Sequence, residues 1–250
     1  MSKLLVVANW KMNPQTEHEA AALARDAAAA VEALQNVEVV LCPPFPFLNT
    51  VREAAPLLFL GAQDCFWEPQ GAYTGEVSAD MLKYMECTHV IVGHSERRRQ
   101  VGETLEMVNK KVRATILKGL TPIVCVGEES EDSDKKELHS QLEQILAGVS
   151  SEDMKNVVLV YEPVWAISAQ GKYHPASPEL VSERISLFRE AVSRMFGEEI
   201  GAGARMLYGG SVNAENVKSF IKEGGVQGAL VGQASLNAAA FANLVRNMIL

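Results

Sequence analysis

HVIVGHSE, residues 89–96, joins an apolar run to an abrupt polar end. Its three consecutive aliphatic residues (90–92) are β-formers with no polar residue between them, which is typical of a parallel strand buried on both faces. A glycine and then His94, Ser95 and Glu96 follow at once. Packing of a strand does not explain such a polar cluster, so these residues are candidates for a functional site.

The same pattern of a continuous apolar run recurs along the whole chain. Seven more such stretches are KLLVVANW (3–10), VEVVLCPP (37–44), LLFLGAQD (57–64), TPIVCVGE (121–128), NVVLVYEP (156–163), RMLYGGSV (205–212) and GALVGQAS (228–235). Strand followed by helix, about eight times in 250 residues, predicts an α/β fold with a single (β/α)8 TIM barrel domain over residues 1–250. A doubly wound open sheet is the alternative, but the first strand is not followed by a Gly-rich dinucleotide fingerprint.

Helical periodicity fills the intervals between these runs. Ser177 is a candidate N-cap followed by Pro178, and Gly119 and Gly197 are candidate stop signals. The acidic run at 128–137 is interpreted as a solvated loop that leads into a helix. The expected helices are 15–34, 104–119, 135–148 and 177–196, with shorter ones at 78–86, 213–223 and 238–249.

Composition excludes several classes of function. The 48% hydrophobic and 22% charged residues are ordinary for a soluble globular protein, and no apolar run is long enough to span a bilayer. The net charge of −8 disfavours diffuse binding to nucleic acid or to an anionic membrane. No export signal is found, so we expect a cytoplasmic protein whose four widely spaced cysteines are reduced and mostly buried. No spacing of histidines or cysteines suggests a metal site.

The ends of the predicted strands carry most of the candidate chemistry, because active sites of such barrels lie at the carboxyl ends of the strands. A lysine, a histidine, a carboxylate and two Gly/Ser turns would meet there, which suits proton transfer beside a carbonyl and capture of a phosphate. The residues concerned are Asn9, Lys11, His94, Ser95, Glu96, Glu162, Gly209, Gly210, Ser211, Gly232, Gln233 and Ser235.

Two of these residues allow a more specific expectation. Glu162 ends an apolar strand, and Pro163 stops the strand behind it, so desolvation would raise the basicity of the carboxylate. His94 precedes a short helix that Ser95 could cap, and the positive end of the helix dipole favours a neutral ring that donates a hydrogen bond. For an isolated Glu or His, a capping or purely structural role is the commoner case.

Six motifs together resemble the triosephosphate isomerase family, in order and over essentially the whole chain: ANWKMN (8–13), IVGHSERR (91–98), PIVCVGE (122–128), YEPVWAI (161–167), LYGGSV (207–212) and LVGQASL (230–236). The resemblance implies that Glu162 shuttles a proton between C1 and C2 of a triose phosphate, and that neutral His94 polarises the carbonyl. It also implies that Lys11 offsets negative charge, that Asn9 positions substrate oxygens, and that Glu96 supports these two residues. No metal or organic cofactor would be needed.

The resemblance extends to the phosphate site and to the subunit contact. Ser168, Ser211, Gly232 and Gln233 would bind the substrate phosphate; Ser168 and Gln233 stand where the family usually has glycine. A side chain there would cost about 1–2 kcal/mol if the backbone needs a positive φ. Residues 163–177 would form a closing lid that is longer than usual. Residues 63–78, with Thr74 at the tip, would enter a neighbouring subunit, which implies a homodimer.

Two other functions remain open at the level of sequence. The altered phosphate turn and lid are compatible with an isomerase of a slightly larger ketose phosphate, such as a tetrose phosphate. A non-catalytic sugar-phosphate-binding or structural dimer is the third possibility, although every expected catalytic residue is present.

Overall fold

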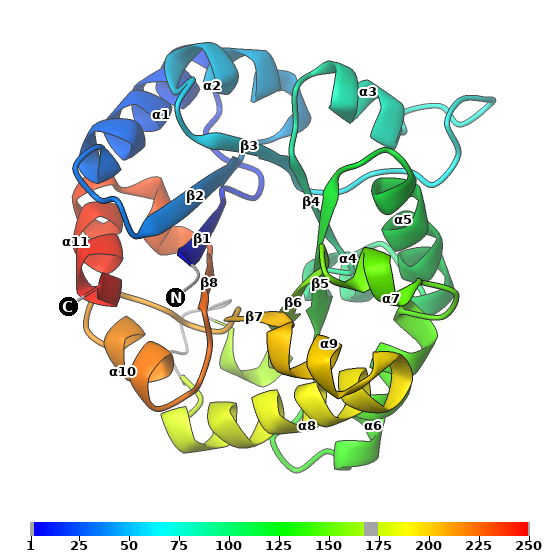
Figure 1. The fold of residues 1–250 in the computed structure, drawn as a ribbon. Coiled ribbons are helices and arrows are strands. Elements are labelled where there is room, and N and C mark those ends of the chain that lie inside the picture. Colours follow the sequence, from blue (N-terminus) through cyan, green and yellow to red (C-terminus); the bar gives the residue numbers. More distant parts are fainter. Residues whose placement is uncertain (1–2, 168–174, 250) are drawn as a thin grey trace.

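The computed structural model describes residues 3–167 and 175–249, and its centre is a closed barrel of parallel strands (Figure 1). The strands are hydrogen-bonded in sequence order, as the sequence predicts, and the (β/α)8 barrel is confirmed. They are β1 (Leu4–Asn9), β2 (Val37–Cys42), β3 (Phe59–Ala62), β4 (His89–Val92), β5 (Thr121–Val126), β6 (Val158–Tyr161), β7 (Arg205–Tyr208) and β8 (Gly228–Val231).

The barrel closes between β1 and β8, where one glycine is required. Leu5 pairs with Gly228, and a Cβ on Gly228 would lie 1.9 Å from the carbonyl oxygen of Leu5. Gly228 also has a φ of +156°, which side chains disfavour. The first residue of the last strand therefore has to be glycine for the sheet to close.

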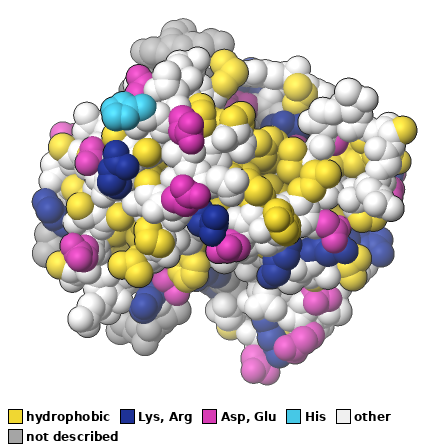
Figure 2. Space-filling model, turned by 90° about the horizontal axis from the view of Figure 1, so that it is seen from above, with side chains coloured by type: hydrophobic (Ala, Val, Ile, Leu, Met, Phe, Trp, Pro, Cys, Tyr) yellow, Lys and Arg dark blue, Asp and Glu magenta, His cyan; other side chains and the backbone are white. Residues whose placement is uncertain are grey.

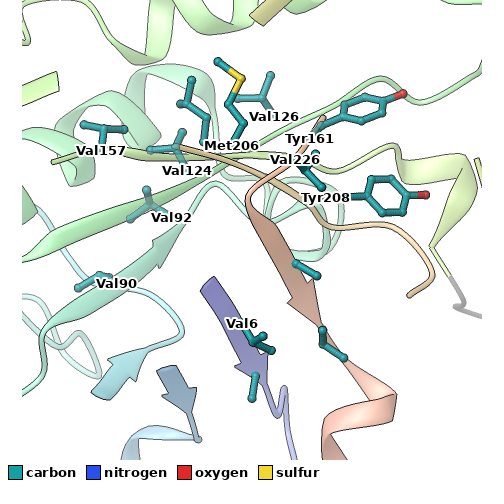
Figure 3. Close-up of a cluster of buried hydrophobic side chains, with 14 of the residues drawn as sticks. Val6, Val90, Val92, Val124, Val126, Val157, Tyr161, Met206, Tyr208 and Val226 are labelled. Atoms are coloured by element: carbon teal, nitrogen blue, oxygen red, sulfur yellow. The ribbon is translucent and has the colours of Figure 1, made fainter. Parts of the chain in front are cut away.

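Two layers of apolar side chains account for the continuous apolar strands. Side chains that point into the barrel fill its interior: Leu5, Val7, Val40, Cys42, Ile91, Ile123, Cys125, Val158, Val160, Leu207 and Leu230. The alternate residues point outward, and the outer layer drawn in Figure 3 includes Val6, Val90, Val92, Val124, Val126, Tyr161, Met206 and Tyr208. Both faces of each strand are thus buried, because helices cover the outer face.

A ring of helices surrounds the barrel in Figure 1. The seven helices expected from periodicity are all present, with ends that shift by at most four residues. They are α1 (Glu17–Val31), α3 (Ala79–Tyr84), α5 (Leu105–Leu117), α6 (Lys135–Ile145), α8 (Pro178–Phe196), α10 (Val217–Lys222) and α11 (Ala238–Ile249). Ser177 caps α8 by accepting a hydrogen bond from the Leu180 amide, and Gly197 ends it with a φ of 102°. Gly119 follows α5 with a φ of 64°.

Several short elements lie outside the expected helices. They are α2 (Leu48–Ala54), α7 (Ser151–Met154), α9 (Glu198–Gly203) and the 3-10 turns η1 (Phe45–Phe47), η2 (Val164–Ala166) and η3 (Gln233–Leu236). Elements of one or two turns carry too few apolar residues to show a helical period. The expected short helix after β4 is α4 (Ser95–Gln100), but His94 rather than Ser95 is its N-cap, so that detail of the prediction is wrong.

The interpretation of residues 128–137 as a solvated loop is also wrong at its first residue. Glu128 is 1% exposed, because its carboxylate accepts hydrogen bonds from Tyr161 and Arg184. Most of the residues after Glu128 are exposed, and α6 begins at Lys135 with Asp134 as its cap. Charge composition alone could not show that one acidic residue of the run turns into the core.

The surface and the thiols agree with the compositional expectations. All four cysteines are free and buried. On the side of the barrel that Figure 2 shows, acidic and basic side chains are interspersed among apolar ones. None of the helices in the described part of the chain is long and apolar enough to cross a lipid bilayer.

Candidate active site

Glu162 follows β6 at the carboxyl-terminal mouth of the barrel and is 1% exposed. Its carboxylate is held from one side by α4. The Ser95 amide donates to Oε2 at 2.9 Å, and the Ser95 hydroxyl donates to Oε1 at 3.0 Å. Nε2 of His94 lies 3.0 Å from Oε1. The fourth and sixth strand ends are therefore brought into direct contact.

These partners decide the charge of the carboxyl group. Burial raises the pKa of Glu162, but His94, the Ser95 amide and the positive charge of Arg98 together outweigh burial and hold that pKa below its ordinary value. The sequence suggested that desolvation would make this carboxylate more basic. In the arrangement seen here the opposite direction wins, because the buried carboxylate keeps a full set of donors. Glu162 is ionised in this arrangement at neutral pH.

Two influences act on His94 in opposite directions. Burial lowers the pKa of the ring, but the facing carboxylates of Glu162 and Glu96 raise it above the ordinary value in spite of Lys11. The ring nitrogen Nδ1, however, accepts a hydrogen bond of 3.2 Å from the Glu96 amide at the start of α4. A protonated Nδ1 could not accept that bond, so the geometry favours the tautomer with its single proton on Nε2, directed at Glu162.

Lys11 lies beside this pair on the loop after β1. Its Nζ is 2.5 Å from Oε1 of Glu96, and its amide donates to Oδ1 of Asn9 at 3.0 Å. Lys11 has a φ of 53°, a conformation that is costly for a side chain with a Cβ and that requires support from its surroundings. Gln63 supplies support by donating from Nε2 to the Lys11 carbonyl at 2.8 Å. A Cβ on Gly232 would be 3.3 Å from Cε of Lys11, so β8 also reaches this residue.

The turn after β7 contacts the carboxylate from the other side. A Cβ on Gly209 would lie only 2.6 Å from Cγ1 of Val160 and at an ordinary contact distance of 3.5 Å from Cβ and Cγ of Glu162, so this turn packs closely on β6 and beside that side chain. Ser211 is buried, and both its amide and its hydroxyl donate to the carbonyl of Ala166, at 3.0 and 2.7 Å. Ser211 therefore links the seventh turn to the segment that follows Glu162.

The turn after β8 is held by a hydrogen bond of its own and carries an exposed side chain. Ser235 donates its hydroxyl to the Gly232 carbonyl at 2.6 Å and shapes the turn. Gln233 begins η3 and its side chain is exposed. Gln233 does not have a positive φ, so the strain considered for that position does not arise. Ser168 lies outside the described residues.

The sequence placed Ser95 at the site but not in its present role, and it did not single out several other residues. Ser95 was considered as a helix cap, whereas it is a ligand of the Glu162 carboxylate. Gln63 and Glu128 stand at the ends of the third and fifth strands. Applying the strand-end rule to all eight strands would have found both. Arg184, which reaches Glu128 from α8, carries no signal in the sequence.

Comparison with known proteins places this arrangement in a family. The family model described as "Triosephosphate isomerase" matches residues 4–248. The chain belongs to the triosephosphate isomerase family. It is 40% identical to the triosephosphate isomerase of Dictyoglomus thermophilum, over 99% of this chain and 100% of that protein. It is 42% identical to the triosephosphate isomerase of Carboxydothermus hydrogenoformans, over the full length of both. It is also 42% identical to that of Geotalea uraniireducens, over 98% and 99%.

Members of the triosephosphate isomerase family are isomerases, and the chain is an enzyme of that class. Coverage of the full length of the relatives includes every strand end described above. The resemblance inferred from the six sequence motifs is confirmed.

Proposed function

We propose that this protein interconverts dihydroxyacetone phosphate and D-glyceraldehyde 3-phosphate, with Glu162 as the base. The observation that carries the proposal is the buried, ionised carboxylate of Glu162 beside Nε2 of His94 at the mouth of the barrel. The names of the full-length relatives support the choice of substrate. The pathway role, glycolysis and gluconeogenesis in the cytoplasm, is part of the same proposal.

The first chemical step needs the carboxylate to leave its present donors. In the arrangement described here both carboxylate oxygens of Glu162 are occupied by Ser95 and His94. Substrate binding would move the carboxylate from Ser95 to C1 of dihydroxyacetone phosphate. The loss of two hydrogen bonds and the exclusion of water raise its basicity at the moment a proton must be taken. The pKa of Glu162 is thus low in the free enzyme and rises when substrate is bound, which is the state in which the carboxylate acts as a base.

The proposed isomerisation transfers one proton between two carbons and one between two oxygens. Glu162 removes a proton from C1, the C1–C2 double bond forms, and the C2 oxygen takes the negative charge of an enediolate. His94 donates a hydrogen bond from Nε2 to the oxygens of that enediolate, and the hydroxyl proton is transferred between O1 and O2. Glu162 then returns its proton to C2, and C1 becomes the aldehyde. No net oxidation occurs and no cofactor enters the scheme.

Lys11, Asn9 and Glu96 would set the charge around the reacting oxygens. Lys11 and Glu96 form an ion pair that is about one-third exposed, so the ammonium can turn toward a bound anion. Asn9 is buried and fixes the Lys11 amide. We assign to Lys11 the balance of substrate charge, to Asn9 the placement of substrate oxygens, and to Glu96 the orientation of Lys11.

The turns after β7 and β8 would hold the phosphate. Gly232 and Gln233, together with Ser168, would present backbone N–H groups to it, as the family pattern implies. Ser211 would join them once its amide leaves the carbonyl of Ala166. The position of Lys11 supports this assignment, because its Nζ would lie 3.8 Å from a Cβ on Gly232 and so places a positive charge beside the turn after β8.

Turnover of a substrate panel tests the proposal. Purified protein should interconvert the two triose phosphates with a clear preference over tetrose phosphates, and Glu162→Gln should lose that activity. Preference for a tetrose phosphate would contradict the choice of substrate. Absence of turnover in a folded parent protein, with sugar phosphate still bound, would favour a non-catalytic binding protein.

We also propose that the protein is a homodimer through residues 63–78. Figure 1 shows the segment between β3 and α3 projecting beyond the ring of helices. Residues 69–76 are exposed, including Thr74, and Tyr73 is 45% exposed. Met12, at 83% exposed, is an apolar side chain that a second copy would cover. Light scattering should give twice the chain mass for the parent and a smaller mass for Thr74→Arg; a monomeric parent would contradict the proposal.

A further inference from the structure

Gln141 lies on the buried side of α6, and its side-chain amide uses its whole hydrogen-bonding capacity. Oε1 accepts from the Gly127 amide at 3.3 Å and from Nη1 of Arg98 at 3.4 Å. Nε2 donates to the Gly127 carbonyl at 3.1 Å and to Glu137 at 3.2 Å. Gln141 therefore pairs with Gly127 through both of its backbone groups, as a neighbouring strand would.

Gly127 is the residue that packs on the main chain of Glu162. A Cβ on Gly127 would lie 1.9 Å from the carbonyl oxygen of Glu162 and 2.4 Å from its carbonyl carbon. Hydrogen bonds flank this contact on both sides: the Glu162 amide donates to Val126 at 2.8 Å, and the Val164 amide donates to Glu128 at 3.0 Å. A displacement of Gly127 would therefore be transmitted directly to the backbone of Glu162.

Arg98 connects the same amide to α4. It lies three residues after Ser95, whose amide and hydroxyl bind the Glu162 carboxylate. Nη1 of Arg98 donates to the Cys125 carbonyl at 3.3 Å and to Gln141. The positive charge of Arg98 is one of the influences that lower the pKa of Glu162. Gln141 thus joins the two elements that border Glu162, namely the turn after β5 and α4.

We propose that Gln141 is a positioning residue for Glu162, and that it acts through Gly127 on the backbone and through Arg98 on the charge beside the carboxylate. The inference rests on the proposed role of Glu162 as the base. A buried amide that only satisfied the backbone of the turn would change stability when removed. A positioning residue also changes the rate of proton transfer and its dependence on pH.

The test compares Gln141→Met with Gln144→Met. Methionine is close to glutamine in length and cannot make the four hydrogen bonds. Gln144 is on the same helix, its side chain is exposed, and it bonds Ser140 within the helix, so it is a matched control. We expect kcat of Gln141→Met to fall about tenfold or more, with KM within about twofold of the parent value, because small displacements of a base cost rate rather than binding. Gln144→Met should keep the parent values.

The pH profile gives a readout that a structural role would not move. Without Gln141, Arg98 loses one of its two anchors, and its charge acts less strongly on Glu162. The pKa of Glu162 in the free enzyme should rise, and the acid limb of kcat/KM should move to higher pH. Arg98→Met should move the acid limb in the same direction. The double variant should move it little further, because both substitutions remove the same interaction between Gln141 and Arg98.

A closer variant covers the case in which Gln141→Met does not fold. Gln141→Glu keeps the size and the acceptor for Gly127 and Arg98, but cannot donate to the Gly127 carbonyl, and it too should lower kcat. Parent kcat and parent pH profile in a folded Gln141→Met protein, or parent kcat in Gln141→Glu, would overturn the proposal. Glu162→Gln is measured alongside. If Glu162→Gln stays active, Glu162 is not the base and the proposed function is wrong. If Glu162→Gln is inactive while Gln141→Met behaves as the parent, only the role of Gln141 is wrong.

Discussion

Glu162 and Asp64 are two buried carboxylates, 1% and 4% exposed, and their environments push them in opposite directions. Glu162 has dedicated donors, and its pKa is held below the ordinary value. Asp64 faces Lys111, at 2.7 and 2.8 Å, and Arg97, at 2.9 Å. Glu103 binds Lys111 as well and lies 3.6 Å from Arg97. Burial, with Glu103 in the same cluster, raises the pKa of Asp64 to about 6 in spite of both cations.

The comparison teaches that nearby cations alone do not stabilise a buried carboxylate. When two anions share two cations, four charges must lose their hydration. The attraction among them can be too weak to offset that cost, and the ionised form of each anion is then disfavoured. Glu162 relies on a serine and on a ring that keeps a lone pair on Nδ1, and these donors can be exchanged for substrate. The Asp64 cluster is a fixed structural connection between the loop after β3, α4 and α5, and the Glu162 cluster is an arrangement that can open.

The largest expected effect separates the two carboxylates by activity. Glu162→Gln should lower kcat by about 10³-fold or more, the size expected for a positioned base, while Asp64→Asn should stay within a few fold of the parent. Steady-state kinetics on both variants checks this. An active Glu162→Gln, or an Asp64→Asn that folds normally and loses the same activity, would break the distinction.

The second effect concerns stability. Lys111→Met removes a cation that is 4% exposed at its side chain and leaves Asp64 and Glu103 with Arg97 as their one shared cation. Breaking a buried pair in this way costs about 3 kcal/mol or more of unfolding free energy. Denaturant unfolding measures it, with Lys110→Met as the control, because Lys110 pairs with Glu106 on the exposed face of the same helix. A loss of less than about 1 kcal/mol would show that the cluster is not tightly coupled.

The third effect is the pH dependence that follows from the raised pKa of Asp64. The folded protein binds this proton more tightly than the unfolded chain, so the contribution of Asp64 to stability rises as pH falls from about 6 to about 4 and is lost again as pH rises. A shift from 3.8 to about 6 corresponds to about 3 kcal/mol as an upper value. The difference in unfolding free energy between parent and Asp64→Asn should widen in favour of the parent over this range. A difference that is constant from pH 7 to pH 4 would contradict it.

The smallest effect probes a single donor of Glu162. Ser95→Ala keeps the backbone amide on Oε2 and removes the hydroxyl from Oε1. We expect a loss of about 1–2 kcal/mol of stability and a rise in the pKa of Glu162, which moves the acid limb of kcat/KM to higher pH. Activity measured from pH 5 to pH 9 shows the movement, and an unchanged acid limb would mean that the hydroxyl does not stabilise the carboxylate.

The barrel and the strand-end residues could be predicted from the sequence because both follow local patterns. Apolar runs and their ends mark each strand, so His94 and Glu162 stand where the fold brings them together. The helix ends were predicted well where a cap residue was present, as at Ser177 and Gly197.

The buried polar connections could not be predicted, because they join residues that are distant in the sequence. Asp64 and Lys111 are separated by 47 positions, and the helix around Lys111 has the charge content of an exposed helix. Gln141 and Arg184 likewise look like surface residues of polar helices. Only the packing of α4, α5, α6 and α8 on the barrel turns them inward.

Isomerisation in D2O tests the central claim, that Glu162 itself carries the proton between carbons. The parent protein should produce D-glyceraldehyde 3-phosphate with deuterium at C2, because a protonated Glu162 exchanges with solvent before it returns the proton. Glu162→Gln should show neither turnover nor deuterium incorporation, while Asp64→Asn should label as the parent does. Mass spectrometry of the product measures the deuterium content for all three proteins. Deuterium incorporation by Glu162→Gln at the parent rate would contradict the claim that Glu162 carries the proton.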